Sequence, residues 1–547
     1  MVVGVDRITG CDGRVAATPW RRWAGLKPKA WADYTAGVSD VPHSAVQRLK
    51  TELPLLGGLL LGALGMVLRA DALVLDGRVS GYHWPAWMFG AWNHAHGRME
   101  LLDPFRQPLH SALVGTLGPW LGLLDASLLL AGLSMLTVVV ASGLSVRLVA
   151  GPWAGALAAA AVPLSPVATS GARWGTAYPL LTGALAAAVA ASVWASRKPS
   201  VARVGMAGGA AMYATMADER GLLLLAVVLP LLAWRAIGSV PARGLAVVVV
   251  AGALLGTRSA PWLGQSHTLT AAEKRAVQTL VVARWATESK DVAMVDACRT
   301  VSPQTLLTPA FLTTSCAPQV LRHNLQQALP GATAFPLWVL LLAVVSLAAP
   351  RRWRDDPAAP LLGMGVVLAG LGTAVWTPLP ARYQLFYTGF LGLLVPLSLG
   401  WRLRRHPRVC AMTCGGLWLL VAVTDPHEHD RYPVKGIDAR WLQPADLATV
   451  VRGLVPPSVP VRDCARASVE LALLPDHTAP RGPELSIPDA RPCLEWIRGT
   501  SPRALVVRPR RTLPGTAGPV DIAATVASTP EWVLGARAYG VEIWLRR

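Results

Sequence analysis

The sequence predicts an α-helical polytopic membrane protein with a small α/β domain at its C-terminal end. Three observations predict this class. Of the 547 residues, 53% are hydrophobic and only 15% are charged, whereas soluble proteins carry about 25% charged residues. Apolar segments of nearly membrane-spanning length recur along the chain, and arginines gather in alternate connections between them. After residue 424, short alternating motifs typical of strands and helices replace the long apolar segments.

The first 50 residues form a polar, basic arm without the apolar core of a signal peptide, so we expect a cytoplasmic N-terminal arm at 1–50. The transmembrane domain follows at 51–424, with about 11 transmembrane helices, several shorter than the ~20 residues of a perpendicular span. The predicted spans are 53–69, 126–146, 152–168, 178–195, 204–217, 221–234, 244–257, 334–350, 359–377, 384–400 and 409–424. The glycine- and proline-interrupted stretch 111–125 is expected to be interfacial or re-entrant.

The positions of the basic residues predict the orientation. Apart from the arm, the basic connections begin at Arg147, Arg197, Arg235, Arg351 and Arg402, and the positive-inside rule makes them cytoplasmic. The opposite side then holds the outer loops 71–125 and 258–333 and the tail. Abundant alanine, glycine and proline with more arginine than lysine are typical of a GC-rich bacterial genome, so we expect a multi-pass protein of the bacterial cytoplasmic (inner) membrane.

The tail, 425–547, is predicted to be a soluble extracytoplasmic α/β domain. Its motifs suggest a helix at 444–454, a strand at 504–509, a helix at 521–528 and a closing strand pair before the C-terminus. Cysteines are paired by region, because Cys298 and Cys316 share an outer loop and Cys464 and Cys493 share the tail. These pairs suit two disulfides in an oxidising compartment, and the alternative is four free thiols.

Ionisable residues gather at the predicted outer ends of the spans. Such residues are costly near a bilayer and usually serve a function. They are Asp71, Asp76, His83, His94, His96, Glu100, Asp103 and Arg106 in the first loop, and Arg173, Asp218, Glu219, Arg220, Arg382 and Tyr383 near later spans. A carboxylate that accepts a proton from a hydroxyl, beside arginines that bind a leaving phosphate, suits sugar transfer from a polyprenyl phosphate. For each arginine alone, the simpler interpretation is interfacial snorkelling or a salt bridge.

Three stretches carry a resemblance to a known family: DPFRQPLHSAL at 103–113, the run 145–189, and ARYQLFYTGFLGLLVPL at 381–397. In layout and spacing, most of 53–424 resembles the GT-C superfamily of membrane glycosyltransferases, especially the protein-mannosyltransferase-like branch (glycosyltransferase family 39 type) that includes the lipid A aminoarabinose transferases. The resemblance implies hexosyl or pentosyl transfer from a polyprenyl-phosphate-linked donor to a lipid, glycan or protein acceptor at the outer membrane face.

The sequence departs from the family at one position. Where the resemblance implies an Asp-Glu pair, this chain has GYHWPAW, with His83 in place of a carboxylate. We therefore assign the general base first to Asp76, with Asp71 and Asp103 as alternates and His83 as a substitute. The residues expected to bind the donor phosphate are Arg106, Arg173, Arg220, Arg382 and Tyr383, and those expected near donor and acceptor are His94, His96, Asp218 and Glu219.

A second class of function stays open, namely a non-catalytic GT-C-like protein of envelope assembly or a lipid or sugar transporter. The sequence has no Walker A loop, dinucleotide-binding fingerprint or GxSxG elbow, which argues against ATP-driven transport and serine hydrolysis. The net charge of +19 does not form a basic stripe with interleaved aromatics, so we expect a lipid bilayer and no nucleic acid as partner. No residues are assigned to a metal, and a divalent metal is left open as cofactor.

Overall fold

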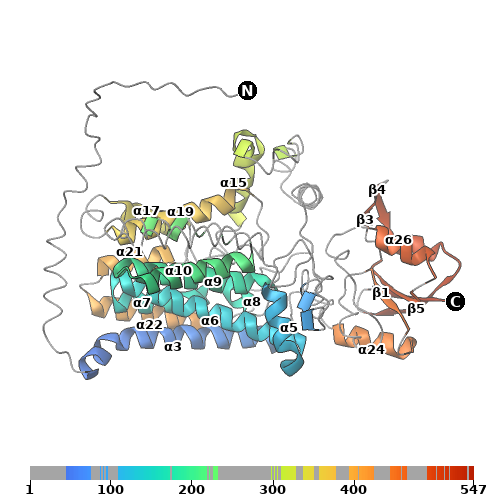
Figure 1. The fold of residues 1–547 in the computed structure, drawn as a ribbon, viewed down its shortest axis with the longest axis horizontal. Coiled ribbons are helices and arrows are strands. Elements are labelled where there is room, and N and C mark those ends of the chain that lie inside the picture. Colours follow the sequence, from blue (N-terminus) through green and yellow to red (C-terminus); the bar gives the residue numbers. More distant parts are fainter. Residues whose placement is uncertain are drawn as a thin grey trace, which may run out of the picture. The chain divides into compact units, whose positions relative to one another are not determined.

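The computed structural model is mostly helical and ends in a small β-sheet (Figure 1). The chain divides into two compact units, Met1–Leu53 and Pro54–Arg547. The structure describes residues 45–75, 87, 90–91, 94–95, 109–172, 175–218, 221, 224, 226–228, 230–231, 297–298, 301, 305, 309–327, 337–349, 357–376, 393–403, 406–423, 444–456, 459–464, 490–500, 502–509, 512–515, 518–538 and 541–547.

Most predicted spans coincide with helices. The helices described before the terminal sheet are α3 (Ala45–Leu75), α5 (Leu109–Leu121), α6 (Leu123–Ala150), α7 (Pro152–Ala161), α8 (Pro166–Gly171), α9 (Ala177–Arg197), α10 (Val201–Ala217), α15 (Cys316–Gln327), α17 (Leu337–Ala348), α19 (Ala358–Trp376), α21 (Leu394–Leu403) and α22 (Pro407–Val423). Of these, α5 and α15 lie outside the predicted spans. Among the described residues, three segments are long and apolar enough to cross a membrane, Lys50–Arg69, Asp125–Ala150 and Ala177–Arg197. The predicted span 244–257 lies outside the described residues, so the number of spans stays a prediction.

The predicted span 152–168 is not one continuous helix. It consists of α7, the 3-10 turn η2 (Val162–Leu164) and the start of α8. Proline has no backbone N–H, and Pro163 and Pro166 therefore interrupt the α-helical hydrogen bonds. The Ser165 side chain caps α8 by accepting a hydrogen bond from the Ala168 N–H at 3.3 Å. The bend is thus built from residues that stop one helix and begin the next.

Helices α3 and α7 pack closely through small residues. A Cβ at Gly58 would overlap the backbone of Ala156, and one at Gly62 would lie 2.5 Å from the Ala159 carbonyl oxygen. Further along, the Arg69 guanidinium donates a hydrogen bond to the Pro163 carbonyl at 3.0 Å. The contacts advance along both helices in the same direction, so α3 and α7 are parallel. Glycines spaced by four allow this approach of two membrane helices.

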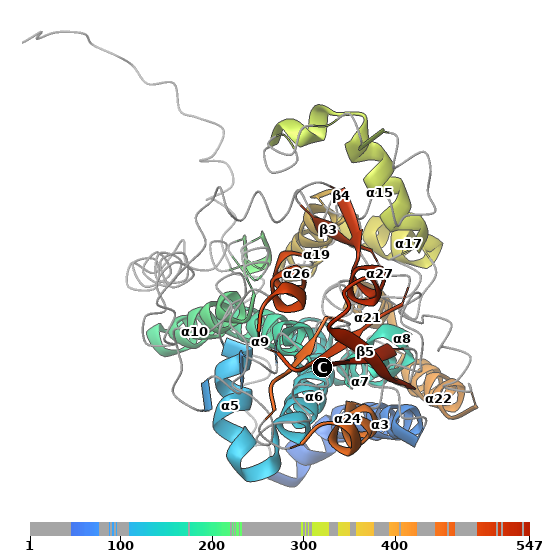
Figure 2. The ribbon, with the colours of Figure 1, turned by 90° about the vertical axis from the view of Figure 1, so that its right-hand side faces the viewer.

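Several other helices pack beside one another, as Figure 2 shows for α6, α7 and α9 seen end-on. Gly151, with φ of +97°, turns the chain from α6 into α7, and Gly155 of α7 packs on Arg147 of α6. Gly400 of α21 packs on Ala154 of α7. The last turns of α6 and α21, which carry Arg147 and Arg402, therefore lie at the same end of the bundle. The predicted topology requires this arrangement, and the orientation in the membrane stays a prediction.

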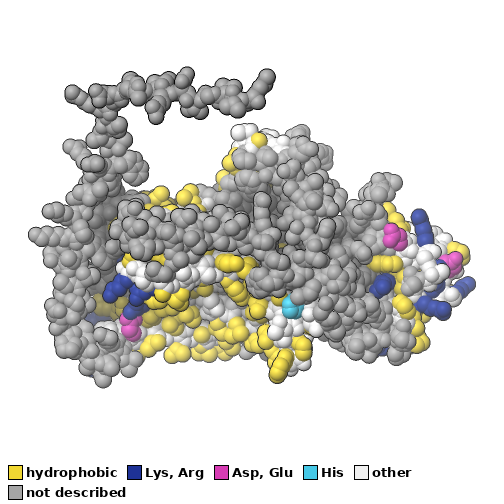
Figure 3. Space-filling model, in the orientation of Figure 1, with side chains coloured by type: hydrophobic (Ala, Val, Ile, Leu, Met, Phe, Trp, Pro, Cys, Tyr) yellow, Lys and Arg dark blue, Asp and Glu magenta, His cyan; other side chains and the backbone are white. Residues whose placement is uncertain are grey.

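The outer faces of the bundle are apolar. Leu60 and Leu68 on α3 are 71% and 57% exposed, and Met412 and Val423 on α22 are 77% and 75% exposed. Figure 3 shows hydrophobic side chains gathered over the face where Figure 1 draws α3. Large exposed apolar surfaces mark a membrane or protein contact, and helices of this length and composition favour the membrane. These surfaces are those of a membrane protein.

The C-terminal sheet has the strand order β1-β2-β6-β5, formed by β1 (Val461–Asp463), β2 (Ala504–Val507), β5 (Trp532–Ala538) and β6 (Val541–Arg546). The first pair is parallel and the other two are antiparallel. Helices α24 (Pro444–Leu454), α26 (Arg491–Arg498) and α27 (Ile522–Ala527) accompany it, as does a hairpin of β3 (Thr512–Gly515) and β4 (Gly518–Asp521). The two predicted helices (α24 and α27), the strand β2 and the closing strand pair are confirmed, whereas β1, α26 and the hairpin were not predicted. That this region is a separate extracytoplasmic domain stays a prediction.

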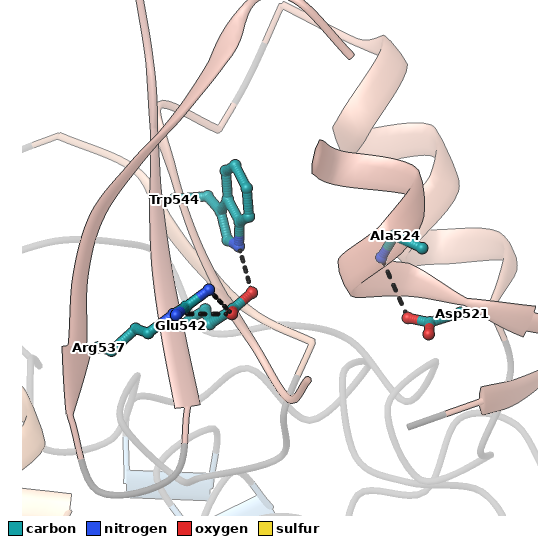
Figure 4. Close-up of polar contacts among 5 residues, drawn as sticks. All are labelled: Asp521, Ala524, Arg537, Glu542 and Trp544. Atoms are coloured by element: carbon teal, nitrogen blue, oxygen red, sulfur yellow. Dashed lines mark hydrogen bonds and ion pairs between the residues drawn. The ribbon is translucent and has the colours of Figure 1, made fainter. Parts of the chain in front are cut away.

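Polar contacts fix the closing strands and the helix before them (Figure 4). Glu542, which is buried, accepts hydrogen bonds from Arg537 Nε and Trp544 Nε1, both at 3.1 Å. Asp521 caps α27 by accepting a hydrogen bond from the Ala524 N–H at 3.1 Å. Two donors offset the cost of burying this carboxylate. Because one donor is on β5 and the other on β6, the contacts favour a single register of the β5–β6 pair.

Both cysteine pairs are disulfides, which confirms the paired interpretation over four free thiols. Cys298–Cys316 joins two parts of the long loop with a Cα–Cα distance of 4.6 Å, and Phe311 and Val320 are buried beside it. Cys464–Cys493 joins the end of β1 to α26 with a Cα–Cα distance of 5.9 Å. Each disulfide therefore links two segments of the chain within a small cluster of buried side chains.

Candidate functional site

The structure describes the side chains of two candidate site residues, His94 and Asp218. The candidate base Asp71 lies near the end of α3, where only its backbone is described. The others lie outside the described residues: Asp76, His83, His96, Glu100, Asp103, Arg106, Arg173, Glu219, Arg220, Arg382 and Tyr383. The structure therefore shows the helices next to these residues, and the roles of the residues themselves stay predictions.

Helix α5 is the element against which the His94 segment packs. A Cβ at Gly115 of α5 would lie 2.5 Å from the Ala91 carbonyl oxygen and 3.0 Å from His94 Cβ. A Cβ at Gly90 would likewise lie 2.5 Å from Ser111 Oγ. Glycine at these two positions lets Gly90, Ala91 and His94 lie directly against α5, because any larger residue would push the two segments apart.

Aromatic and polar contacts continue the same interface. The rings of Trp87 and His110 meet edge to face, with centroids 5.2 Å apart and an interplanar angle of 70°. Ser111 Oγ donates a hydrogen bond to the Trp87 carbonyl at 3.5 Å, and all three residues are buried. Sequence reasoning gave His110 and Ser111 no role, although they lie within the DPFRQPLHSAL stretch that carried the family resemblance. Their part is to hold the loop on α5.

Helix α10, which ends at Asp218, also contacts α5. Asp218 ends α10 in extended backbone and donates its N–H to the Ala214 carbonyl at 3.2 Å. The Gly221 N–H then donates to the Asp218 carbonyl at 2.9 Å, which turns the chain. Helix α5 therefore contacts both the segment that carries His94 and the helix that ends at Asp218, and a common site for the two residues stays a prediction.

Arg69 is a buried cation that sequence reasoning did not select. It lies in α3, two residues before the candidate base Asp71, and is 4% exposed. Its guanidinium donates to the Pro163 carbonyl of η2, which is left accessible by the break between α7 and α8. A signal was present in the sequence, because Arg69 ends an otherwise apolar span and buried cations near a bilayer usually have a partner or a task.

Burial lowers the pKa of His94 below its ordinary value near 6.5, so the imidazole is neutral at pH 7. Unfolding restores the ordinary pKa, so the unfolded chain takes up the proton more readily. Protonation of His94 therefore favours the unfolded state. The free energy of unfolding is unaffected by this residue above pH 6.5 and decreases as the pH falls from there through the lowered folded-state pKa. We expect the melting temperature of the detergent-solubilised protein to fall less between pH 7.5 and 5.5 in His94→Gln than in the wild type. Equal falls in the two proteins would contradict this role of His94.

No metal site is evident in the described part of the chain, where no three His, Cys, Asp or Glu side chains gather closely enough to hold an ion. The carboxylates that would be the natural ligands lie outside the described residues: Asp76, Glu100, Asp103 and Glu219. Whether a divalent metal serves as cofactor therefore stays open, as it did from the sequence.

No protein-family model and no curated protein matches the sequence. Among solved structures, ArnT from Cupriavidus metallidurans bound to undecaprenyl phosphate matches with a TM-score of 0.58 and 16% identity, over 89% of this chain and 97% of that chain. ArnT from the same organism in the apo state gives a TM-score of 0.44 and 15% identity over the same shares. The Archaeoglobus fulgidus oligosaccharyltransferase in complex with Zn and sulfate gives 0.47 and 12%, over 82% of this chain and 67% of that chain.

The ArnT match extends over nearly the full length of both chains, so it concerns the whole arrangement of helices and the terminal region rather than a local motif. Identity of 16% is too low to carry over substrates or catalytic residues, but it confirms the resemblance of layout seen in the sequence. The chain therefore shares its fold with the ArnT structure from Cupriavidus metallidurans.

Proposed function

We propose that this protein is a membrane glycosyltransferase that moves a sugar from a polyprenyl-phosphate-linked donor to an acceptor at the outer face of the bacterial cytoplasmic membrane. The observation that carries the proposal is the shared fold with an ArnT structure that holds undecaprenyl phosphate. The ionisable residues of the first loop and of the ends of later spans support it, because carboxylates and arginines are the groups that such a transfer needs.

In the proposed reaction, the acceptor hydroxyl attacks the anomeric carbon of the donor sugar. The bond between that carbon and the phosphate oxygen breaks, and the polyprenyl phosphate leaves with the electron pair. Asp76 takes the proton of the acceptor hydroxyl, with Asp71 and Asp103 as alternates and His83 as substitute. Arg106, Arg173, Arg220, Arg382 and Tyr383 stabilise the charge on the departing phosphate, since a guanidinium donates two parallel hydrogen bonds to it.

The packing of the first loop on α5 supports this assignment of one site. The contacts of Gly90, Gly115 and Trp87 fix the position of the neighbouring loop residues on α5. Catalytic groups need such positioning, because a displacement of about 1 Å can cost about 100-fold in rate. We therefore assign His94 and Asp218 to the surroundings of donor and acceptor, together with His96 and Glu219, which lie outside the described residues.

The proposed topology follows the basic connections. The arm 1–50 is cytoplasmic, the helices of 51–424 cross the membrane, and the tail 425–547 is an extracytoplasmic α/β domain. The Cys464–Cys493 disulfide supports an extracytoplasmic tail, because disulfides persist in oxidising compartments.

A comparison of envelope lipids and glycans with and without this protein tests the proposal. We expect the deletion strain to lack one glycosylated lipid, glycan or protein and to accumulate its sugar donor, and we expect the wild-type chain to restore the product. Mass spectrometry of lipid extracts and released glycans measures both. Identical envelopes in the two strains would contradict the transferase proposal and favour a non-catalytic role. The absence of an Asp-Glu pair at Tyr82–His83 would agree with that role.

A further inference from the structure

Six cationic residues with described side chains lie at one end of the helical bundle, and we call them the basic rim: Arg147, Arg197, Lys198, Arg203, Arg402 and Arg408. Each lies in the first or last turn of an apolar helix or in the turn beside it. The carboxylates whose side chains are described between 54 and 423 belong to Asp125 and Asp218, which lie at helix ends away from the rim. Within 54–423 the described side chains at the rim are therefore all cationic, and Glu52, six residues before Gly58 in α3, is an acid outside this range.

Helix contacts bring the two halves of the rim to the same end. Gly400 packs on Ala154, and Gly155 packs on Arg147, so α6 and α21 end together. Helix α9 begins shortly after α8 and returns along α6, with Gly183 against Ser134. From that contact, α6 and α9 each continue for ~20 Å at ~1.5 Å per residue to Arg147 and Arg197. The α9–α10 turn therefore lies at the level of the α6–α7 turn.

Protein contacts fix the positions of two of the guanidinium groups, and some N–H donors of each group are not used in these contacts. Arg203 lies over the Trp194 ring, 4.5 Å from its centroid, and donates one hydrogen bond to the Lys198 carbonyl at 3.3 Å. Arg402 Nε donates to Ser346 Oγ at 3.1 Å, and Ser398 Oγ donates to the same oxygen at 2.9 Å. A guanidinium has five N–H donors, so each keeps donors for a further acceptor.

The turn between α21 and α22 keeps a further cation beside Arg402. The His406 N–H donates to the Leu403 carbonyl at 2.7 Å, and the Val409 N–H donates to the His406 carbonyl at 3.1 Å. Arg408 is thereby held close to Arg402, and both side chains are exposed. Lys198 is likewise exposed beside Arg203. Each half of the rim thus pairs a held guanidinium with a second, exposed cation.

We propose that the basic rim binds the phosphate headgroups of anionic phospholipids. The rim lies where apolar helices end, which in a bilayer is the depth of the headgroups. Held guanidinium groups match phosphate geometry, and each basic residue at an anionic membrane surface contributes about fivefold in affinity. The positive-inside rule accounts for cations on this side, but it does not predict that lipids of one headgroup stay bound. This inference does not depend on the proposed transferase activity.

Lipid retention by the full-length protein tests the proposal. The protein is reconstituted in nanodiscs of equal phosphatidylglycerol and phosphatidylcholine, re-extracted in mild detergent, and its retained lipids are quantified by mass spectrometry. We expect the wild type to be enriched in phosphatidylglycerol. The pair variants Lys198→Gln/Arg203→Gln and Arg402→Gln/Arg408→Gln should each reduce the enrichment by about fivefold or more.

Two further variants make the result specific. Arg203→Lys/Arg402→Lys keeps the charge and should keep most of the enrichment. Arg498→Gln/Arg503→Gln removes exposed arginines beside the terminal sheet and should leave the enrichment unchanged. Equal retention of the two lipids by the wild type, full enrichment in the combined four-residue Gln variant, or an equal loss in the Arg498/Arg503 control would overturn the proposal. Displacement of the lipid by excess inorganic phosphate would also overturn it, since the site would then be one for soluble anions.

Discussion

Replacing the proposed general base is expected to abolish sugar transfer. In Asp76→Asn the side chain keeps its size but cannot accept the proton of the acceptor hydroxyl. A general base contributes about 10²- to 10⁴-fold to the rate, and we expect a loss of that order. The measurement is product formation in membranes that contain the variant and a lipid extract as the source of donor.

A matched control separates lost catalysis from lost folding. Asp125→Asn removes another carboxylate, in the first turn of α6, where the side chain is exposed and has no proposed role. It should retain full activity, and both variants should be present in the membrane at wild-type amounts. Full activity of Asp76→Asn would remove Asp76 from the role of base, and Asp71→Asn and Asp103→Asn would then be compared in the same assay.

Filling the contact between α3 and α7 is expected to destabilise the helical bundle. A leucine at Gly58 would place its side chain into the backbone of Ala156, so the two helices would have to separate. Overpacking of a tight interior typically costs about 1–3 kcal/mol, and a clash with backbone falls at the upper end of that range or beyond. We expect Gly58→Leu to lower the melting temperature of the detergent-solubilised protein by several degrees.

The neighbouring glycine provides the control. Nothing lies within 4 Å of a Cβ at Gly57, so Gly57→Leu places the same side chain on the same helix in open space. It should leave the melting temperature nearly unchanged. If both variants melt alike, the close approach of α3 and α7 is not what stabilises this part of the bundle.

The sequence predicted elements where a local pattern specifies them. Helix α24 at Pro444–Leu454 matches its predicted range, and the alternating residues of β5 and β6 marked the closing strand pair. Strand β1 was missed because it has three residues, one of which is the buried Asp463, and such a segment has no readable alternation. Helix α26 was missed because its sequence, RPCLEWIR, is too short and polar to stand out.

The break between α7 and α8 shows another limit. Averaging hydropathy over a window joins 152–168 into one span, because Pro163 and Pro166 are themselves not strongly polar. Their effect is on backbone hydrogen bonds, which a hydropathy average does not represent. The same break exposes the carbonyl that Arg69 contacts, so the buried arginine and the broken helix were missed together.

The residue types of a candidate site can be proposed from the sequence, whereas its geometry cannot. Ionisable residues at span ends are visible in the sequence, because charges are rare in such an apolar chain. The contact of His94 with Gly115 depends on how α5 folds back on the first loop, and no periodicity encodes such a long-range contact. The same holds for the edge-to-face pair of Trp87 and His110, whose spacing along the chain has no helical or strand period.

The most direct test of the proposed function is binding of the carrier lipid itself, since it requires neither the sugar nor the acceptor to be known. Undecaprenyl phosphate and undecaprenol differ only in the phosphate that the proposed arginines would bind. We predict that undecaprenyl phosphate raises the melting temperature of the purified protein in a concentration-dependent manner, that undecaprenol does not, and that Arg173→Gln/Arg382→Gln removes the difference. An equal response to both lipids, or none to either, would contradict the claim that this protein uses a polyprenyl-phosphate-linked donor.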